Sequence, residues 1–290
     1  VALNPEETLM ATGDFLGNVY IFSTTYLGSE PIYIFNFNAG IRSLAWGLSS
    51  PPYLLVGCMD GNIYKWNYTD LSSMPEILQS GIHGSITCLN VLNVENNELL
   101  LTSSTEGILG VYIMEPKSNN FNKIHSFTAH EPQSDHDDKE SFGSLEKYAE
   151  IWSNCWNPKS SLKSLVFATC SEDQTCKIWE MGQNKPSELT ILKGHSKAVT
   201  CVDWQETELG FILATCSDDR SMRIYDWKEG KMELIEVVII DFVKEWFTLT
   251  YMALEKGGRR VACAAQNGFL FVYDMKNKKF EFSERIHLGS

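Results

Sequence analysis

The chain has 290 residues, of which 43% are apolar and 12% aromatic, and its 24 basic and 37 acidic side chains give a net charge of −13. Such a charge repels phosphate backbones at long range and favours basic partners, so it argues against nucleic-acid binding unless a local basic patch restores it. No apolar run approaches the roughly 20 residues that a membrane helix needs, so no membrane insertion is expected, and nothing resembles a signal peptide. The chain begins with Val rather than Met, which leaves open whether a targeting segment precedes it.

Short runs that alternate apolar and polar residues, separated by polar turns, continue along the whole chain. Alternation with a period of two is typical of antiparallel strands rather than helices. The runs form six groups of four. The first three groups are expected at 1–4, 9–13, 18–22 and 31–37; at 41–46, 53–58, 62–67 and 76–79; and at 86–91, 99–103, 109–113 and 123–128. The last three are expected at 151–156, 165–169, 175–179 and 188–192; at 199–204, 211–215, 222–227 and 232–239; and at 247–253, 260–264, 269–273 and 279–285.

An aromatic residue recurs near the end of the third run of every group. These residues are Phe22, Trp66, Tyr112, Trp179, Tyr225 and Tyr273, with spacings of 44, 46, 67, 46 and 48 residues. Two units match closely, ATCSEDQTCKIWE at 168–180 and ATCSDDRSMRIYD at 214–226. A period of about 40–45 residues is typical of four-stranded propeller blades.

The unit that contains residues 195–227 begins with Gly194 and His195 and ends in a Trp-Asp-like pair, Tyr225 and Asp226. It resembles a WD repeat, and the chain as a whole is similar to the WD-repeat β-propeller family. The resemblance implies an all-β fold of four-stranded antiparallel blades, six of them visible, in a single domain over residues 1–290. We favour seven blades in the natural protein because seven is the commonest number in the family; direct closure of six is the alternative.

The spacing of 67 residues places one insertion at about 131–149, which carries six acids against two lysines. Its composition predicts a mobile acidic loop. The run SDHDD within it resembles a metal site, but closely spaced His and Asp in a polar loop are usually solvated. We therefore expect no metal and no cofactor.

The eight cysteines all fall inside predicted strands or directly at their ends, and pairs such as Cys170 and Cys216 occupy the same blade position. This is the behaviour of small buried hydrophobic residues rather than of a disulfide framework or a zinc site. Free, buried thiols predict a reducing, intracellular compartment, either cytoplasm or nucleus.

In the WD-repeat family a buried His, Ser/Thr, Asp and Trp form a hydrogen-bonded chain within a blade, which satisfies polar groups in a core without water. The resemblance implies that the residues of this chain at the family's positions are structural rather than catalytic. The set comprises His130, Ser171, Asp173 and Trp179 in blade four, His195, Ser217, Asp219 and Tyr225 in blade five, and Asp60 and Trp66 in blade two.

The sequence carries no enzyme signature: it lacks a phosphate-binding glycine loop, an H-E-x-x-H motif and a G-x-S-x-G motif. The resemblance implies instead a non-catalytic interaction scaffold or adaptor in a multi-protein complex, which binds a peptide or protein on the channel face. Two positions per blade point to that face, beside the start of the first strand and just before the turn Asp. They map to Phe15, Arg42, Met59, Glu150, Trp152, Glu172, Asp218, Trp246 and Gln266.

These positions combine aromatic and apolar groups with three acids, so we expect a basic or Arg/Lys-containing segment as partner, anchored by Trp152 and Trp246. Two alternatives stay open. One is an RNA- or ribonucleoprotein-binding propeller, against which the net charge argues. The other is a ubiquitin-ligase substrate adaptor, which tends to carry an Arg two residues after the Trp-Asp pair, where this chain has Met181, Trp227 and Met275.

Overall fold

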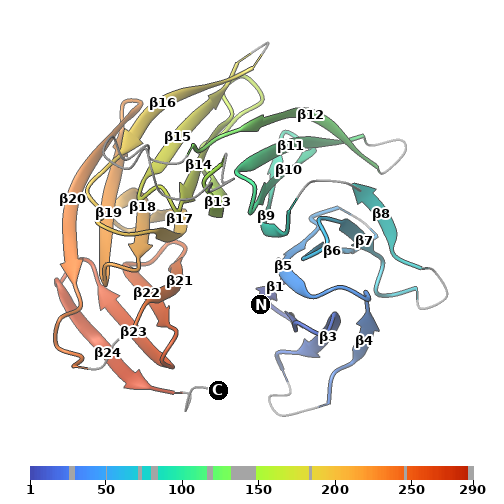
Figure 1. Cartoon of the computed structure of the whole chain (residues 1–290), viewed down its shortest axis with the longest axis horizontal. Helices are drawn as coiled ribbons and strands as arrows, with labels where there is room; N and C mark the ends of the chain where they lie inside the picture. Colours follow the sequence, from blue (N-terminus) through green and yellow to red (C-terminus); the bar gives the residue numbers. More distant parts are fainter. Residues whose placement is uncertain are drawn as a thin grey trace, which may run out of the picture. The chain divides into compact units, whose positions relative to one another are not determined.

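The computed structural model describes residues 1–25, 30–49, 51–70, 74–79, 84–115, 120–131, 148–182, 185–244 and 247–286. The chain divides into two compact units, Val1–Ala129 and His130–Ser290. Within these ranges the fold is all-β, with six four-stranded antiparallel sheets that are the blades of a β-propeller fold, three in each unit (Figure 1). Of the insertion expected at 131–149, residues 132–147 lie outside the described residues. The single domain over 1–290 stays a prediction.

In the first unit each sheet is built from four consecutive strands joined in chain order. The strands are β1 Ala2–Leu3, β2 Leu9–Gly13, β3 Asn18–Ser23 and β4 Tyr33–Asn36; β5 Ile41–Trp46, β6 Leu54–Cys58, β7 Ile63–Trp66 and β8 Glu76–Gln79; and β9 Ile86–Val94, β10 Asn97–Ser104, β11 Ile108–Glu115 and β12 Asn120–Thr128.

The second unit repeats this arrangement. Its strands are β13 Ile151–Trp156, β14 Val166–Ser171, β15 Cys176–Met181 and β16 Pro186–Leu192; β17 Val199–Thr207, β18 Gly210–Ser217, β19 Ser221–Lys228 and β20 Lys231–Ile239; and β21 Leu249–Leu254, β22 Arg260–Ala265, β23 Phe269–Asp274 and β24 Lys279–Arg285. Every strand overlaps its predicted run. The main differences are in blades three and five, whose strands extend further into their hairpins than the runs do.

A tight turn with one left-handed residue joins the second and third strands of every blade. The residues with positive φ are Gly17, Gly61, Gly107, Gln174, Arg220 and Gly268, with values between 65° and 92°. Glycine adopts this conformation at no steric cost, which explains its presence in four of the six turns. The turn fixes the direction of the residues on either side of it, so equivalent positions of different blades present their side chains alike.

A β-bulge near the start of the first strand is repeated in five blades. The pairing with the second strand skips one residue each time: Arg42, Thr87, Trp152, Thr200 and Thr250. A bulged residue is left out of the ladder, and its side chain is redirected. Arg42 and Trp152 therefore occupy one structural position, although the sequence around them differs.

The hydrophobic cores lie between neighbouring blades of the same unit. First strands contact each other, β1 with β5 and β5 with β9 in the first unit, and β13 with β17 and β17 with β21 in the second. In the first unit, for example, Trp66 is 1% exposed and packs with Phe35 and Phe37 of the preceding blade. Each blade thus buries its apolar face on the next one, as in other repeat architectures.

None of the eight cysteines, all of which lie among the described residues, forms a disulfide bond. Seven are buried and Cys88 is half-buried, so the expectation that all eight are buried is wrong for that residue. Among the described residues, no helix is long and apolar enough to cross a membrane.

Candidate functional site

At the turn end of the blades, two backbone positions are tied together in the same way five times. The residue before the turn donates its backbone N–H to the carbonyl of the residue that precedes the blade's first strand. The donors are Met59, Thr105, Glu172, Asp218 and Gln266, and the distances are 2.8–3.1 Å. Because this bond recurs, the pre-turn side chain and the bulge side chain of one blade leave the backbone from adjacent, fixed points.

In the first unit this end presents an apolar group. Phe15 is 79% exposed and Met59 is 44% exposed, whereas Arg42 is half-buried. The backbone oxygen of Phe15 and the sulfur of Met59 both lie so close to Gly40 that a side chain at that position would collide with them. These two residues of neighbouring blades therefore lie close together. They form a small exposed apolar surface.

In the second unit the same end presents an aromatic residue with carboxylates. The indole N–H of Trp152 donates to the Glu172 carboxylate at 2.9 Å, which joins the bulge position of blade four to its pre-turn position. Asp218 holds the pre-turn position of blade five. Burial raises its pKa, the negative charge of Glu172 raises it further, and Lys197 opposes the shift. A cation beside Asp218 would stabilise its ionised form, which burial and Glu172 disfavour, so this arrangement suits a positively charged ligand.

Three other residues predicted for this face contribute less to the candidate site. Glu150 contributes its backbone carbonyl to the bond with Glu172, and its side chain is half-buried. Gln266 is exposed and accepts a hydrogen bond from the Thr248 hydroxyl at 3.2 Å. Trp246 lies outside the described residues.

The second candidate set is a hydrogen-bonded chain inside blade four. His130 is 0% exposed; its Nδ1 lies 2.7 Å from Asp173 Oδ2 and its Nε2 lies 2.8 Å from Thr169 Oγ1. The indole N–H of Trp179 donates to the same Thr169 hydroxyl at 2.9 Å. An indole only donates and a carboxylate only accepts, so Thr169 donates to His130 and His130 donates to Asp173.

The hydroxyl in this chain is Thr169 and not Ser171, which corrects the residue expected from the family pattern. Thr169 and Ser171 lie on the same strand two residues apart, so both face the same side, but only Thr169 reaches the imidazole. Ser171 instead accepts the backbone N–H of Asp173 within the turn.

Blade five repeats both the chain and the correction. His195 Nδ1 lies 3.0 Å from Asp219 Oδ2, and Nε2 lies 2.8 Å from Thr215 Oγ1. Ser217 accepts the backbone N–H of Asp219 and is not the hydroxyl of the chain. Tyr225 stands in the Trp position and hydrogen-bonds Thr215 through its phenol, and burial raises its pKa to about 12.

Blade two has no such chain among its predicted members. Asp60 binds the backbone and the side chain of Asn62 within the turn. Trp66 is core, as described above. Cys58 lies two residues before Asp60, where blades four and five have Ser171 and Ser217. Burial raises the pKa of Cys58 to about 12, so this thiol is un-ionised and inert at neutral pH.

The stability of the chain is expected to fall as the pH falls below about 6.5, because of His130. Burial lowers the pKa of His130, and the hydrogen bond to Asp173 only partly offsets this. The unfolded state, with an ordinary histidine pKa of about 6.5, therefore binds a proton that the folded state does not, and the loss approaches about 1.4 kcal/mol per pH unit. Below about pH 4, Asp173 adds to the loss: burial raises its pKa, but bonds from His130 and Thr175 lower it overall. Urea unfolding at pH 7.5 and 5.5 measures the effect. A His130→Gln variant with the same pH dependence as the wild type would contradict this origin.

Comparison with known proteins agrees with the repeat structure. The family model described as WD domain, G-beta repeat matches residues 140–180 and 186–226. The nuclear distribution protein PAC1 of Komagataella phaffii is 26% identical over 190 residues, which are 62% of this chain and 33% of that protein. The protein transport protein sec13 of Aspergillus fumigatus is 30% identical over 122 residues, 39% of each chain. The Denticleless protein homolog of Mus musculus is 25% identical over 208 residues, 67% of this chain and 25% of that protein. The chain thus spans between a quarter and two fifths of the length of these relatives.

Proposed function

We propose that this chain, a WD-repeat protein of the β-propeller fold, is a non-catalytic scaffold or adaptor that holds a basic protein segment at the turn end of its blades. The observation that carries the proposal is the group of Trp152, Glu172 and Asp218. A tryptophan held by a carboxylate is a rigid anchor, and a second carboxylate beside it selects lysine or arginine.

The internal His–Asp pairs support a structural rather than a catalytic role for the most enzyme-like residues. Both His130 and Asp173 are buried and use their polar atoms within the blade, so neither side chain is open to a substrate. Among the described residues, no cluster of three or more His, Cys, Asp and Glu side chains is arranged to hold a metal. Two of the relatives are named for nuclear distribution and for protein transport, which fits a scaffold or adaptor better than a catalyst.

Affinity purification with mass spectrometry tests the proposal. The bait is the full chain, next to a Glu150→Lys, Glu172→Lys, Asp218→Lys variant. A matched control carries the same change of charge at three exposed acids elsewhere, Glu206→Lys, Glu208→Lys and Glu284→Lys. We expect the wild type and the control to recover the same proteins through basic segments, and the site variant to lose them.

Three outcomes would overturn the proposal or replace it with an alternative. If all three baits recover the same proteins, the site is wrong. If recovery depends on RNA and disappears after ribonuclease treatment, the RNA-binding alternative replaces it. Recovery of a cullin-type ligase as the principal stable partner would favour the substrate-adaptor alternative.

A further inference from the structure

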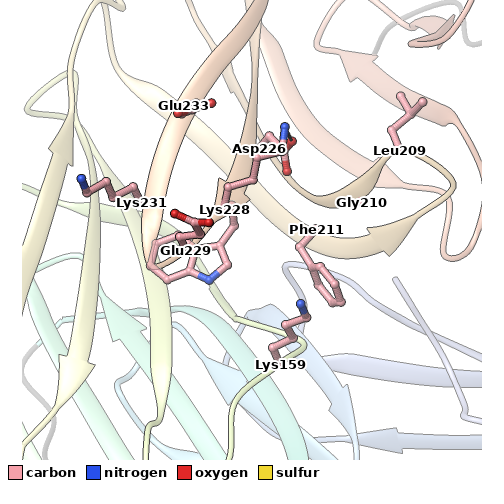
Figure 2. A pocket seen from close by; sticks show the side chains of 10 residues that line it. Lys159, Leu209, Gly210, Phe211, Asp226, Lys228, Glu229, Lys231 and Glu233 are labelled. Carbon is pink, nitrogen blue, oxygen red and sulfur yellow. Dashed lines mark ion pairs between the residues drawn. The ribbon is translucent and has the colours of Figure 1, made fainter.

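A hollow of about 620 Å³ lies at the end of blade five away from the turn of Asp218 (Figure 2). Two hairpins of blade five, β17–β18 and β19–β20, form one wall, and the loop after β13 of blade four forms the other. Asp218 follows the last residue of β18 whereas this hollow surrounds its first, so the two sites are at opposite ends of one strand.

The floor of the hollow is aromatic. Phe211 and Trp227 are both half-buried and line it. Trp227 is held from behind by Trp204, which is 2% exposed and packs edge-on at 5.3 Å between ring centroids. Lys159 approaches from the blade-four side, and its ammonium lies 3.7 Å from the centre of the Phe211 ring (Figure 2).

The lysines that line the hollow differ in whether a carboxylate lies close enough to form an ion pair with them. Asp226 is buried and forms an ion pair with Lys228 at 2.5 Å, so its charge is already neutralised. Lys159 and Lys231 have no carboxylate within ion-pair distance among the described residues. Glu229 and Glu233 also line the hollow and are both exposed, and the negative charge of Glu233 helps to raise the pKa of Lys228. Lys159, whose ammonium faces the aromatic floor, therefore has no counter-ion among the described residues, and an incoming carboxylate would meet it there.

The equivalent place in the first unit is filled, so the hollow is not a necessary result of the fold. Glu98 is the second residue of β10, as Phe211 is the second residue of β18. Met114 lies two residues after Tyr112, as Trp227 lies two residues after Tyr225. Glu98 is 4% exposed and accepts hydrogen bonds from the Tyr53 hydroxyl and the Leu48 amide at 2.5 and 2.7 Å. In blade three the chain places a carboxylate at this position; in blade five Phe211 takes the position and Lys159 faces its ring.

We infer that the hollow is a second peptide site, which takes an acidic segment containing one aromatic or large apolar anchor residue. The anchor packs on Phe211 and Trp227, and a neighbouring carboxylate accepts hydrogen bonds from Lys159, with Lys231 at the rim. The size is suited to two or three side chains, and aromatic walls with a few placed charges are typical of such sites. This site differs from the proposed scaffold site in position and in the sign of its ligand, so each can fail without the other.

The test uses a fluorescein-labelled peptide, Asp-Glu-Asp-Trp-Asp-Glu, and measures its anisotropy on titration with the full chain. We expect saturable binding that is weakened at least tenfold when the peptide's tryptophan is replaced by serine. Lys159→Glu is expected to weaken binding at least tenfold, and Trp227→Ala similarly. Lys279→Glu makes the same change of charge at an exposed lysine of blade six; it is the matched control and is expected to bind as the wild type does.

Lys159 is exposed, so its replacement leaves the fold intact and keeps the test decisive even if Trp227→Ala fails to fold. Absence of saturable binding at millimolar protein would overturn the inference, as would equal binding by Lys159→Glu. Equal binding of a peptide in which lysine replaces every acid would also overturn it.

Discussion

Replacing His130 with Ala is expected to lower the free energy of unfolding of the chain by about 3–5 kcal/mol, the cost of leaving a buried charged partner uncompensated. His130 is the central member of the chain in blade four and is 0% exposed. Its loss leaves the Asp173 carboxylate, whose side chain is 6% exposed, without its closest partner, and deprives Thr169 of its acceptor. Guanidinium unfolding of the full chain, followed by tryptophan fluorescence, measures the change.

Two further variants make this result specific. Thr169→Val keeps the volume and removes only the hydroxyl, and is expected to cost about 1–3 kcal/mol because His130 Nε2 and the Trp179 N–H then lose a buried partner. His125→Ala, at a half-buried position on β12, is the control and is expected to cost less than about 1 kcal/mol. If His130→Ala cost no more than His125→Ala, the buried chain would not be a stabilising element of the blade.

The position of every strand could be predicted because a strand's residues alternate between two environments, and the alternation is visible in the sequence. The ends of strands were less predictable. β9 and β17 run on to Val94 and Thr207 through residues of mixed polarity, where hairpin hydrogen bonds continue the ladder in the absence of an apolar pattern.

The choice between Thr169 and Ser171 shows where a family pattern stops being informative. Both residues are fully buried hydroxyls on one face of β14. Which one meets His130 depends on where along the strand the imidazole lies, and no local property of the sequence fixes that position. The same applies to Thr215 and Ser217 in blade five.

The two candidate sites differ in how much the sequence reveals of them. The turn end could be located because its positions are defined relative to a repeated motif, and the bulge that redirects Trp152 recurs at the same place in five blades. The hollow could not, because Lys159 and Phe211 are 52 residues apart in the chain and meet only when blade five packs on blade four. The sequence pattern of a single blade therefore does not predict a contact between two blades.

Reversing both carboxylates of the turn-end site, Glu172→Lys with Asp218→Lys, is expected to weaken the binding of a basic peptide at least about 100-fold, since like charges placed across an interface cost several kcal/mol. The probe is the peptide Ala-Arg-Lys-Ala-Arg-Lys-Ala, titrated calorimetrically into the full chain. Raising the salt from 50 to 500 mM is expected to weaken wild-type binding, because exposed parts of the interaction are screened. Wild-type affinity in the double variant would contradict the site.

The pH dependence of the same titration identifies Asp218 separately. Its pKa is raised, by burial first and then by Glu172, with Asp219 adding to the shift and Lys197 opposing it. A bound cation favours the ionised carboxylate, so binding releases a proton and the affinity falls as the pH is lowered from 7 towards 4.5. Asp218→Asn keeps the shape of the side chain and removes its titration; it is expected to bind more weakly than the wild type at pH 7 and with less dependence on pH. An unchanged pH profile in that variant would assign the titrating group to another residue, whereas a flattened one would show that the pair of carboxylates, and not the general negative charge of the surface, recognises the cation.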